Sequence, residues 1–131
     1  MKFTMAIAGI AMLAAASPVH AHHSFSMFDH QRKLVIEGTV KEFELVNPHS
    51  WLYVLTTDAD GNVAEWTIEM GGPGGMARSG WRADTVKPGD KIAVEIHPLK
   101  DGTYGGQYLN ATLSDGRIME GGDSGVPPQA R

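Results

Sequence analysis

The sequence of 131 residues contains no cysteine. Disulfide bonds, catalytic thiols, iron–sulfur clusters and cysteine-ligated zinc sites are therefore excluded. The sequence also lacks a basic cluster, because its 11 Lys and Arg residues are interspersed with 15 Asp and Glu residues. A nucleic-acid surface needs clustered cations to displace counterions, so we expect no nucleic-acid partner. A domain of this size must be held together by its apolar core alone.

Long apolar runs are missing too, apart from one near the amino terminus. Residues 5–16 are uncharged and follow Lys2, and Val19 and Ala21 place small residues at the −3 and −1 positions of a cleavage site. The run is about a dozen residues long, which is too short to cross a bilayer comfortably. We predict that residues 1–21 are a signal peptide, that the protein is periplasmic or secreted, and that no membrane span remains after cleavage. An uncleaved anchor is the alternative.

The rest of the chain is dominated by short segments typical of β-strands. In most of them apolar and polar residues alternate with period two, as in strands with one buried face. The phase of this alternation changes near Lys41 and Glu42, which predicts a bulge, and Gly38 is a position where a strand can bend sharply. The expected strands are 34–46, 51–57, 63–70, 91–97, 108–113 and 117–119.

One short helix is expected between the third and fourth strands. Residues 71–75 are four glycines and a proline, which predicts a flexible connection that ends the sheet, and residues 76–80 are long enough for one or two helical turns. This order of elements, with a long coiled first strand, predicts a five-stranded, all-β barrel that is OB-fold-like. A β-sandwich is the alternative, although it normally needs about seven strands.

We divide the chain into a signal peptide (1–21), an N-terminal arm (22–33), the barrel (34–119) and a disordered tail (120–131). The arm is expected to be anchored by Phe25, Met27 and Phe28, with His30 facing solvent. The last long strand is expected to bury alternate residues, namely Leu109, Ala111 and Leu113.

Three tryptophans carry different expectations. Trp66 alternates with Ile68 in the third strand, so it is predicted to lie in the core. Trp81 is predicted to plug the end of the barrel beneath the helix. Trp51 follows the first loop and fits the core and the rim of a ligand site equally well.

Several short motifs recur as a set in one family. The motifs are AHHSF (21–25), EGTV (37–40), NPHSW (47–51), WTIEM (66–70), GW (80–81) and KPGD (87–90). Together they resemble a family of small secreted bacterial proteins catalogued as a domain of unknown function. The resemblance covers about residues 21–119. It implies an exported single-domain protein and brings no activity and no catalytic residue.

Two loops are the predicted location of a site. In an OB-fold, the loops that join the first strand to the second and the fourth to the fifth flank the ligand face. Here the first loop holds Asn47 and His49, and the second begins at His97. The sequence therefore predicts that His49 and His97 lie at one end of the barrel, with Asn47 and Trp51 as ligand-binding residues.

A transition metal is one candidate ligand. Cleavage after Ala21 would make His22 the first residue, so that its α-amine and imidazole could chelate one ion. The predicted metal ligands are His22, His23, His49 and His97. Nitrogen donors suit copper, nickel or zinc, and Met27, Met70 and Met76 are candidate thioether ligands of reduced copper. Alternatively these histidines are ordinary turn and surface residues, because their spacing matches no known metal motif.

We predict a non-catalytic binding module that holds a small ligand or a metal ion at the His49/His97 end. The alternative is an interaction domain that docks an envelope protein through this end or through the outward face of Glu65–Glu69, with no bound ion. A copper enzyme that uses His22 has the least support, because the sequence shows no motif of a substrate cleft.

Overall fold

A computed structural model describes residues 25–121, so the predicted signal peptide and nearly all of the predicted tail lie outside the described residues. This part of the chain begins with a short 3-10 turn, η1 (Phe25–Met27), and contains one α-helix, α1 (Pro73–Arg78). Its strands are β1 (Leu34–Glu44), β2 (Trp51–Thr57), β3 (Val63–Glu69), β4 (Lys91–Pro98), β5 (Gly105–Leu113) and β6 (Ile118–Glu120).

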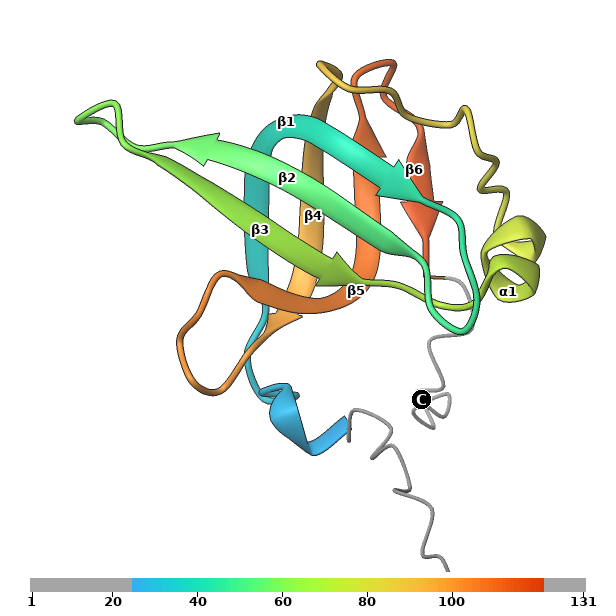
Figure 1. Cartoon of the computed structure of the whole chain (residues 1–131), viewed down its shortest axis with the longest axis horizontal. Coiled ribbons are helices and arrows are strands. Elements are labelled where there is room, and N and C mark those ends of the chain that lie inside the picture. The colour runs from blue at the N-terminus through green and yellow to red at the C-terminus, as the bar shows by residue number, and fades with distance from the viewer. Residues whose placement is uncertain (1–24, 122–131) are drawn as a thin grey trace, which may run out of the picture.

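The first five strands form a closed barrel (Figure 1). The strand order is β3-β2-β1-β4-β5-β6, and a parallel pairing of β3 with β5 closes the circle. The helix lies between β3 and β4 in the chain. The short strand β6 pairs with residues 110–112 of β5 in an antiparallel manner. The prediction of an OB-fold-like five-stranded barrel with one short helix is confirmed.

The long strand β1 serves both halves of the barrel because it bends. Its first part pairs with β4 and its second part with β2, and the register with β2 shifts between Val40 and Glu42. A Cβ atom on Gly38 would lie 2.3 Å from the carbonyl oxygen of Leu55, so only glycine allows the strands to approach this closely. The predicted bulge is confirmed, and Gly38 lies where the two strands come close.

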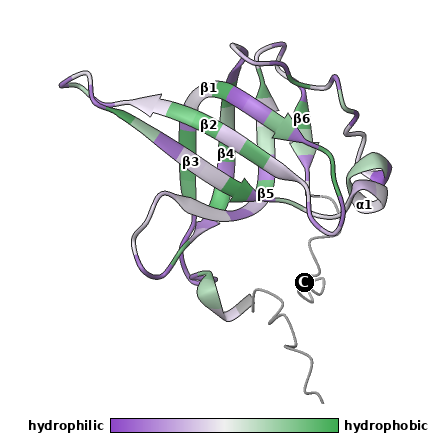
Figure 2. Ribbon diagram, viewed as in Figure 1, coloured by the Kyte–Doolittle hydropathy of each residue, from purple (hydrophilic) through white to green (hydrophobic). Residues whose placement is uncertain are grey.

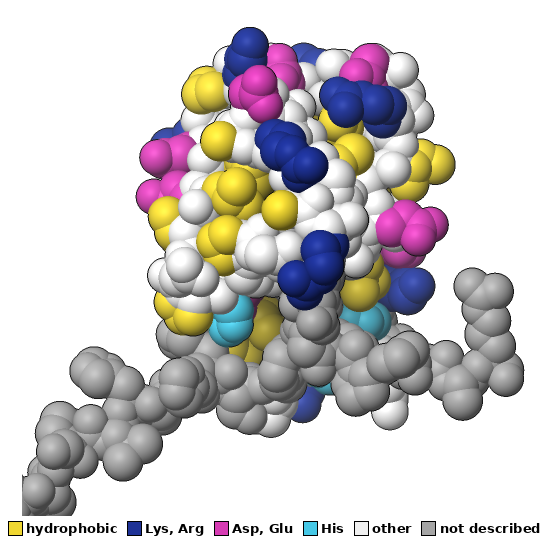
Figure 3. Space-filling model, turned by 90° about the vertical axis from the view of Figure 1, so that its right-hand side faces the viewer, with side chains coloured by type: hydrophobic (Ala, Val, Ile, Leu, Met, Phe, Trp, Pro, Cys, Tyr) yellow, Lys and Arg dark blue, Asp and Glu magenta, His cyan; other side chains and the backbone are white. Residues whose placement is uncertain are grey.

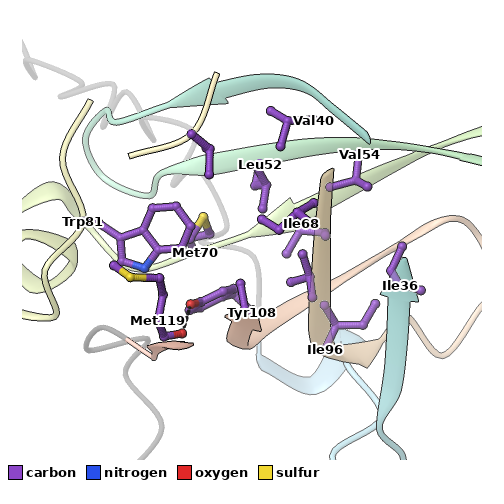
Figure 4. Close-up of a cluster of buried hydrophobic side chains, with 14 of the residues drawn as sticks. Ile36, Val40, Leu52, Val54, Ile68, Met70, Trp81, Ile96, Tyr108 and Met119 are labelled. Atoms are coloured by element: carbon purple, nitrogen blue, oxygen red, sulfur yellow. Dashed lines mark hydrogen bonds between the residues drawn. The ribbon is translucent and has the colours of Figure 1, made fainter. Parts of the chain in front are cut away.

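The core fills the inside of the barrel and continues toward α1, where Trp81 lies (Figure 4). Trp81 is fully buried, and its ring centroid lies 5.1 Å from that of Phe43 and 5.8 Å from that of Tyr108. The Tyr108 hydroxyl donates to the carbonyl of Met119, and burial raises the pKa of Tyr108 well above its usual range. Trp66 is half-buried and packs against the core. The prediction that Trp81 is buried is confirmed, whereas Trp66, predicted to lie in the core, lies at its edge.

Hydrophobic and hydrophilic residues alternate along the strands (Figure 2), and three details differ from the sequence prediction. The helix begins at Pro73, inside the expected flexible connection, because proline is preorganised for the first helical turn. The strand β5 begins at Gly105 rather than at residue 108. A register shift opposite Glu95 and Ile96 brings Tyr108 into the core and leaves Leu109 half-buried, so the prediction for Leu109 was wrong.

Within residues 25–121, the helical segments are too short and too polar to span a bilayer. The longest of them, α1, has six residues.

Candidate ligand-binding site

A recess of about 250 Å³ lies on the outer surface of the barrel, beside the loop between β4 and β5. Alternate residues of β2 and β3 point inward, as the burial of Leu52 and Ile68 shows, so their neighbours point outward into the recess. The lining consists of Met27, Phe28, Trp51, Thr67, Glu69, Leu99, Thr103, Tyr104, Gly105 and Gly106. Trp51 is half-buried there, so of its two predicted places it occupies the rim of a recess.

The N-terminal arm forms one wall of the recess. Phe28 is 4% exposed and makes an isolated β-bridge with Leu99. The amide of Asp29 donates to the carbonyl of Pro98 at 2.8 Å, and the amide of Lys100 donates to that of Met27 at 3.0 Å. The arm is therefore fastened to the β4–β5 loop, which confirms the anchor predicted at Phe28.

The β4–β5 loop forms the opposite wall. Asp101 accepts hydrogen bonds from the hydroxyl and the amide of Thr103, and these bonds hold the pKa of Asp101 below its usual value. The Tyr104 ring is 59% exposed and lies 5.1 Å, between centroids, from that of Trp66. A Cβ atom on Gly105 would lie 3.0 Å from the Thr67 carbonyl oxygen, so glycine lets the loop approach β3. The loop is ordered by its own contacts and places an aromatic ring at the mouth.

Four side chains form a row across four strands on this outer face. In the sheet, Trp51 of β2 is paired with Glu69 of β3, Glu69 with Gln107 of β5, and Gln107 with His97 of β4. Residues that are paired across strands point to the same face, so the four side chains project together. Pairing in the barrel thus brings an aromatic ring, a carboxylate, an amide and an imidazole side by side.

His49 joins this row through a contact with Glu69. Nδ1 of His49 lies 2.5 Å from Oε1 of Glu69, and the two side chains are 40% and 13% exposed. The carboxylate accepts a hydrogen bond from Nδ1 of His49, so Nε2 is the ring nitrogen that takes no part in this contact. Asn47 is exposed, joined to Pro48 by a cis peptide, and is not part of the recess lining.

His97 lies at the other end of the row. It is 9% exposed, and Nδ1 donates to the carbonyl oxygen of Arg32 at 2.7 Å, so this nitrogen carries a proton. The exposed ring of His30 packs edge-on against it with centroids 5.0 Å apart, which agrees with the predicted exposure of His30. The face of His97 that points away from the barrel core is covered by the arm.

His49 and His97 lie at the same end of the barrel, yet they have different partners. Three strand spacings separate the positions of Trp51 and His97, about 14 Å along the sheet. In Figure 3 the histidine side chains lie toward the lower end of the molecule. Within residues 25–121 no three His, Asp or Glu side chains form a group that could hold a metal ion.

The remaining predicted metal ligands fall into two groups. His22 and His23 lie outside the described residues, so a site that includes them stays a prediction. Met70 and Met76 are buried in the core, whereas Met27 lines the recess.

Comparison with known proteins places the chain in a family. The pattern of the "Family of unknown function (DUF6152)" matches residues 10–108. The chain belongs to DUF6152. The matched range includes every residue that lines the recess of this DUF6152 protein. No curated protein and no solved structure gives a significant match.

Sequence reasoning missed three of the residues that define the site in this DUF6152 protein. The sequence identified Glu69 only as part of an outward acidic face, and it left Tyr104 as an unnamed residue of the loop that begins at His97. Gln107 was not considered, because its place beside Glu69 depends on the parallel pairing of β3 with β5, which has no local signal. The outward parity of Glu69 was the one signal that could have directed attention to this face.

The DUF6152 barrel also carries a larger groove of about 520 Å³ at its other end. This groove is bounded by hydroxyl side chains such as Thr39, Thr112 and Ser114, together with Lys91 and Glu37. Its described lining also includes Leu55, Ile92 and Leu113 but no aromatic ring, whereas the recess combines aromatic rings, apolar side chains and one carboxylate, as ligand sites usually do. The smaller recess is therefore the better candidate for a ligand site.

Proposed function

We propose that the protein is an exported, non-catalytic binding module that holds a small organic ligand in the recess beside Trp51 and Glu69. The observation that carries this proposal is the position of the recess. It lies on the outer face of β2 and β3 and beside the β4–β5 loop, which is where OB-fold barrels bind their ligands.

The composition of the walls supports the same proposal. Met27, Phe28 and Leu99 supply apolar surface, and Trp51 and Tyr104 supply aromatic rings. Aromatic and apolar walls bury the body of a small ligand, and a few polar groups fix its orientation. A volume of about 250 Å³ accommodates a ligand with on the order of ten non-hydrogen atoms.

The proposal is tested by screening small aromatic compounds against the full-length processed protein with saturation-transfer NMR. We expect compounds to bind the wild type and to lose most of the signal with Trp51→Ala and with Tyr104→Ala, because each removes a wall. The control is Ile118→Ala, which removes an equally exposed apolar side chain from β6. Binding that is unchanged in both wall variants would contradict the proposal.

A transition-metal ion is the second candidate ligand, favoured by the orientation of two imidazoles. His49 and His97 each have Nδ1 against an acceptor, which leaves Nε2 as the nitrogen that could bind a metal. Histidines that bind metals are usually held in this way. Because no sufficient group exists within residues 25–121, such a site would also need His22 or His23.

The metal proposal is tested by calorimetric titration with copper, nickel and zinc ions. We expect that the wild type binds one of these ions. Binding should be lost in His22→Ala and in at least one of His49→Ala and His97→Ala. His30→Ala is the control, because its exposed ring packs edge-on against those of His97 and Phe28 and is not one of the predicted ligands. Binding that survives all three of the first substitutions would refute these ligands.

A further inference from the structure

The walls of the recess are neutral except for one acidic group. Among the described residues that line it, Glu69 is the one charged side chain, and it is 13% exposed. A carboxylate that is largely withdrawn from water interacts more strongly with a nearby cation than an exposed one does. One carboxylate oxygen, Oε1, faces His49 at 2.5 Å. Oε2 is the carboxylate oxygen that this contact leaves for a ligand.

A second acceptor lies beside this carboxylate. Gln107 is 3% exposed and is not part of the recess lining, but it occupies the position paired with Glu69 on the neighbouring strand, on the same face. Its Oε1 has no hydrogen-bond partner among the described residues. A buried polar atom without a partner costs free energy, and such atoms are usually satisfied by water or by a bound group. What this oxygen requires is a donor.

The aromatic rings of the recess add to its preference for positive charge. Trp51 and Tyr104 line the same space as Glu69, and the faces of such rings attract cations. No Lys or Arg is part of the described lining that could repel a cationic ligand. The carboxylate and the rings therefore favour the same kind of ligand.

We propose that the ligand of the recess is an organic cation with N–H donors, a primary ammonium or an amidinium group on a compact apolar or aromatic body. This inference rests on the proposed function and narrows it to one ligand class. The nitrogen lies against Glu69, while the body packs against Trp51 and Tyr104.

The test compares two probes of nearly equal shape, benzylammonium and benzyl alcohol, binding to the full-length processed protein in a ligand-observed NMR titration. We expect benzylammonium to bind at least about tenfold more tightly, as charge-assisted hydrogen bonds in a partly desolvated site predict. Glu69→Gln should remove this preference while leaving binding of benzyl alcohol nearly unchanged.

The control variant is Glu65→Gln, which removes the other outward carboxylate of β3. Glu65 pairs with Lys41 at 2.6 Å and is not part of the recess lining, so its loss should leave the preference intact. Equal affinities of the two probes, or a preference that survives Glu69→Gln, would overturn the inference and leave the binding module standing. Absence of binding by both probes and by the wider set of aromatic compounds would overturn the inference and the proposed function together.

Discussion

The substitution Gly38→Ala tests the bend that lets β1 serve both halves of the barrel. A Cβ atom at this position would lie 2.3 Å from the carbonyl oxygen of Leu55 and 2.8 Å from Cγ1 of Val54. Ordinary contacts of a Cβ atom begin at 3.4 Å, so β1 and β2 would have to separate by about 1 Å. The oxygen belongs to the backbone of β2, where Leu55 is paired with Thr39, and it cannot rotate away.

The cost of this separation follows from the residues around it. Val40 and Val54 are 1% and 0% exposed, so moving the strands apart opens a well-packed part of the core. Overpacking of this kind costs about 1–3 kcal/mol, and we expect the upper end because backbone rather than a side chain is displaced. A loss of about 3 kcal/mol is a large part of the 5–15 kcal/mol that usually stabilises a domain.

Urea unfolding followed by tryptophan fluorescence measures this loss. The matched control is Gly74→Ala in α1, where a Cβ atom would meet only the Arg78 side chain at 3.6 Å. Alanine there should be neutral or stabilising by up to about 1 kcal/mol, because it favours helix. If Gly38→Ala unfolds within about 0.5 kcal/mol of the wild type, the account of the bent strand is wrong.

Three further predictions concern the core, one tyrosine and the arm. Trp81→Ala should cost about 3–5 kcal/mol in the same urea assay, and a smaller loss than about 1 kcal/mol would contradict its full burial. Burial and a hydrogen bond to Glu44 raise the pKa of Tyr53. The contribution of Tyr53 to stability is therefore complete below about pH 10 and is lost as the pH rises through the raised pKa. In an ultraviolet titration, the difference between wild type and Tyr53→Phe should give a pKa above the usual range for tyrosine. Phe28→Ala should release the arm, so that the amide of Asp29 exchanges with solvent at least about tenfold faster, whereas unchanged exchange would show that other contacts hold it.

Much of the fold could be predicted from the sequence because its signals are local. The alternation of apolar residues predicted most of the strands, and its change of phase near Lys41 located the bulge in β1. The positions that failed depend on pairing between distant strands. Leu109 follows the expected alternation, but the bulge in β5 opposite Glu95 changes the face of the residues before it.

The candidate site was predictable only in part for the same reason. The sequence placed His49 and His97 at one end of the barrel, and Trp51 is at the rim of the recess. The carboxylate and the amide that lie between these histidines come from β3 and β5, whose parallel pairing joins residues 38 positions apart, Glu69 and Gln107. No periodicity within a strand reports such a pairing, because it depends on the closure of the whole barrel.

The most direct test of the proposed ligand site is a two-dimensional NMR titration of the nitrogen-15-labelled protein with benzylammonium. The account predicts that the largest amide shifts fall on the described residues around the recess, foremost Thr67, Glu69 and Gly105. Shifts centred instead on the groove at the other end of the barrel, around Thr39 and Thr112, or no shifts at saturating concentration, would contradict it.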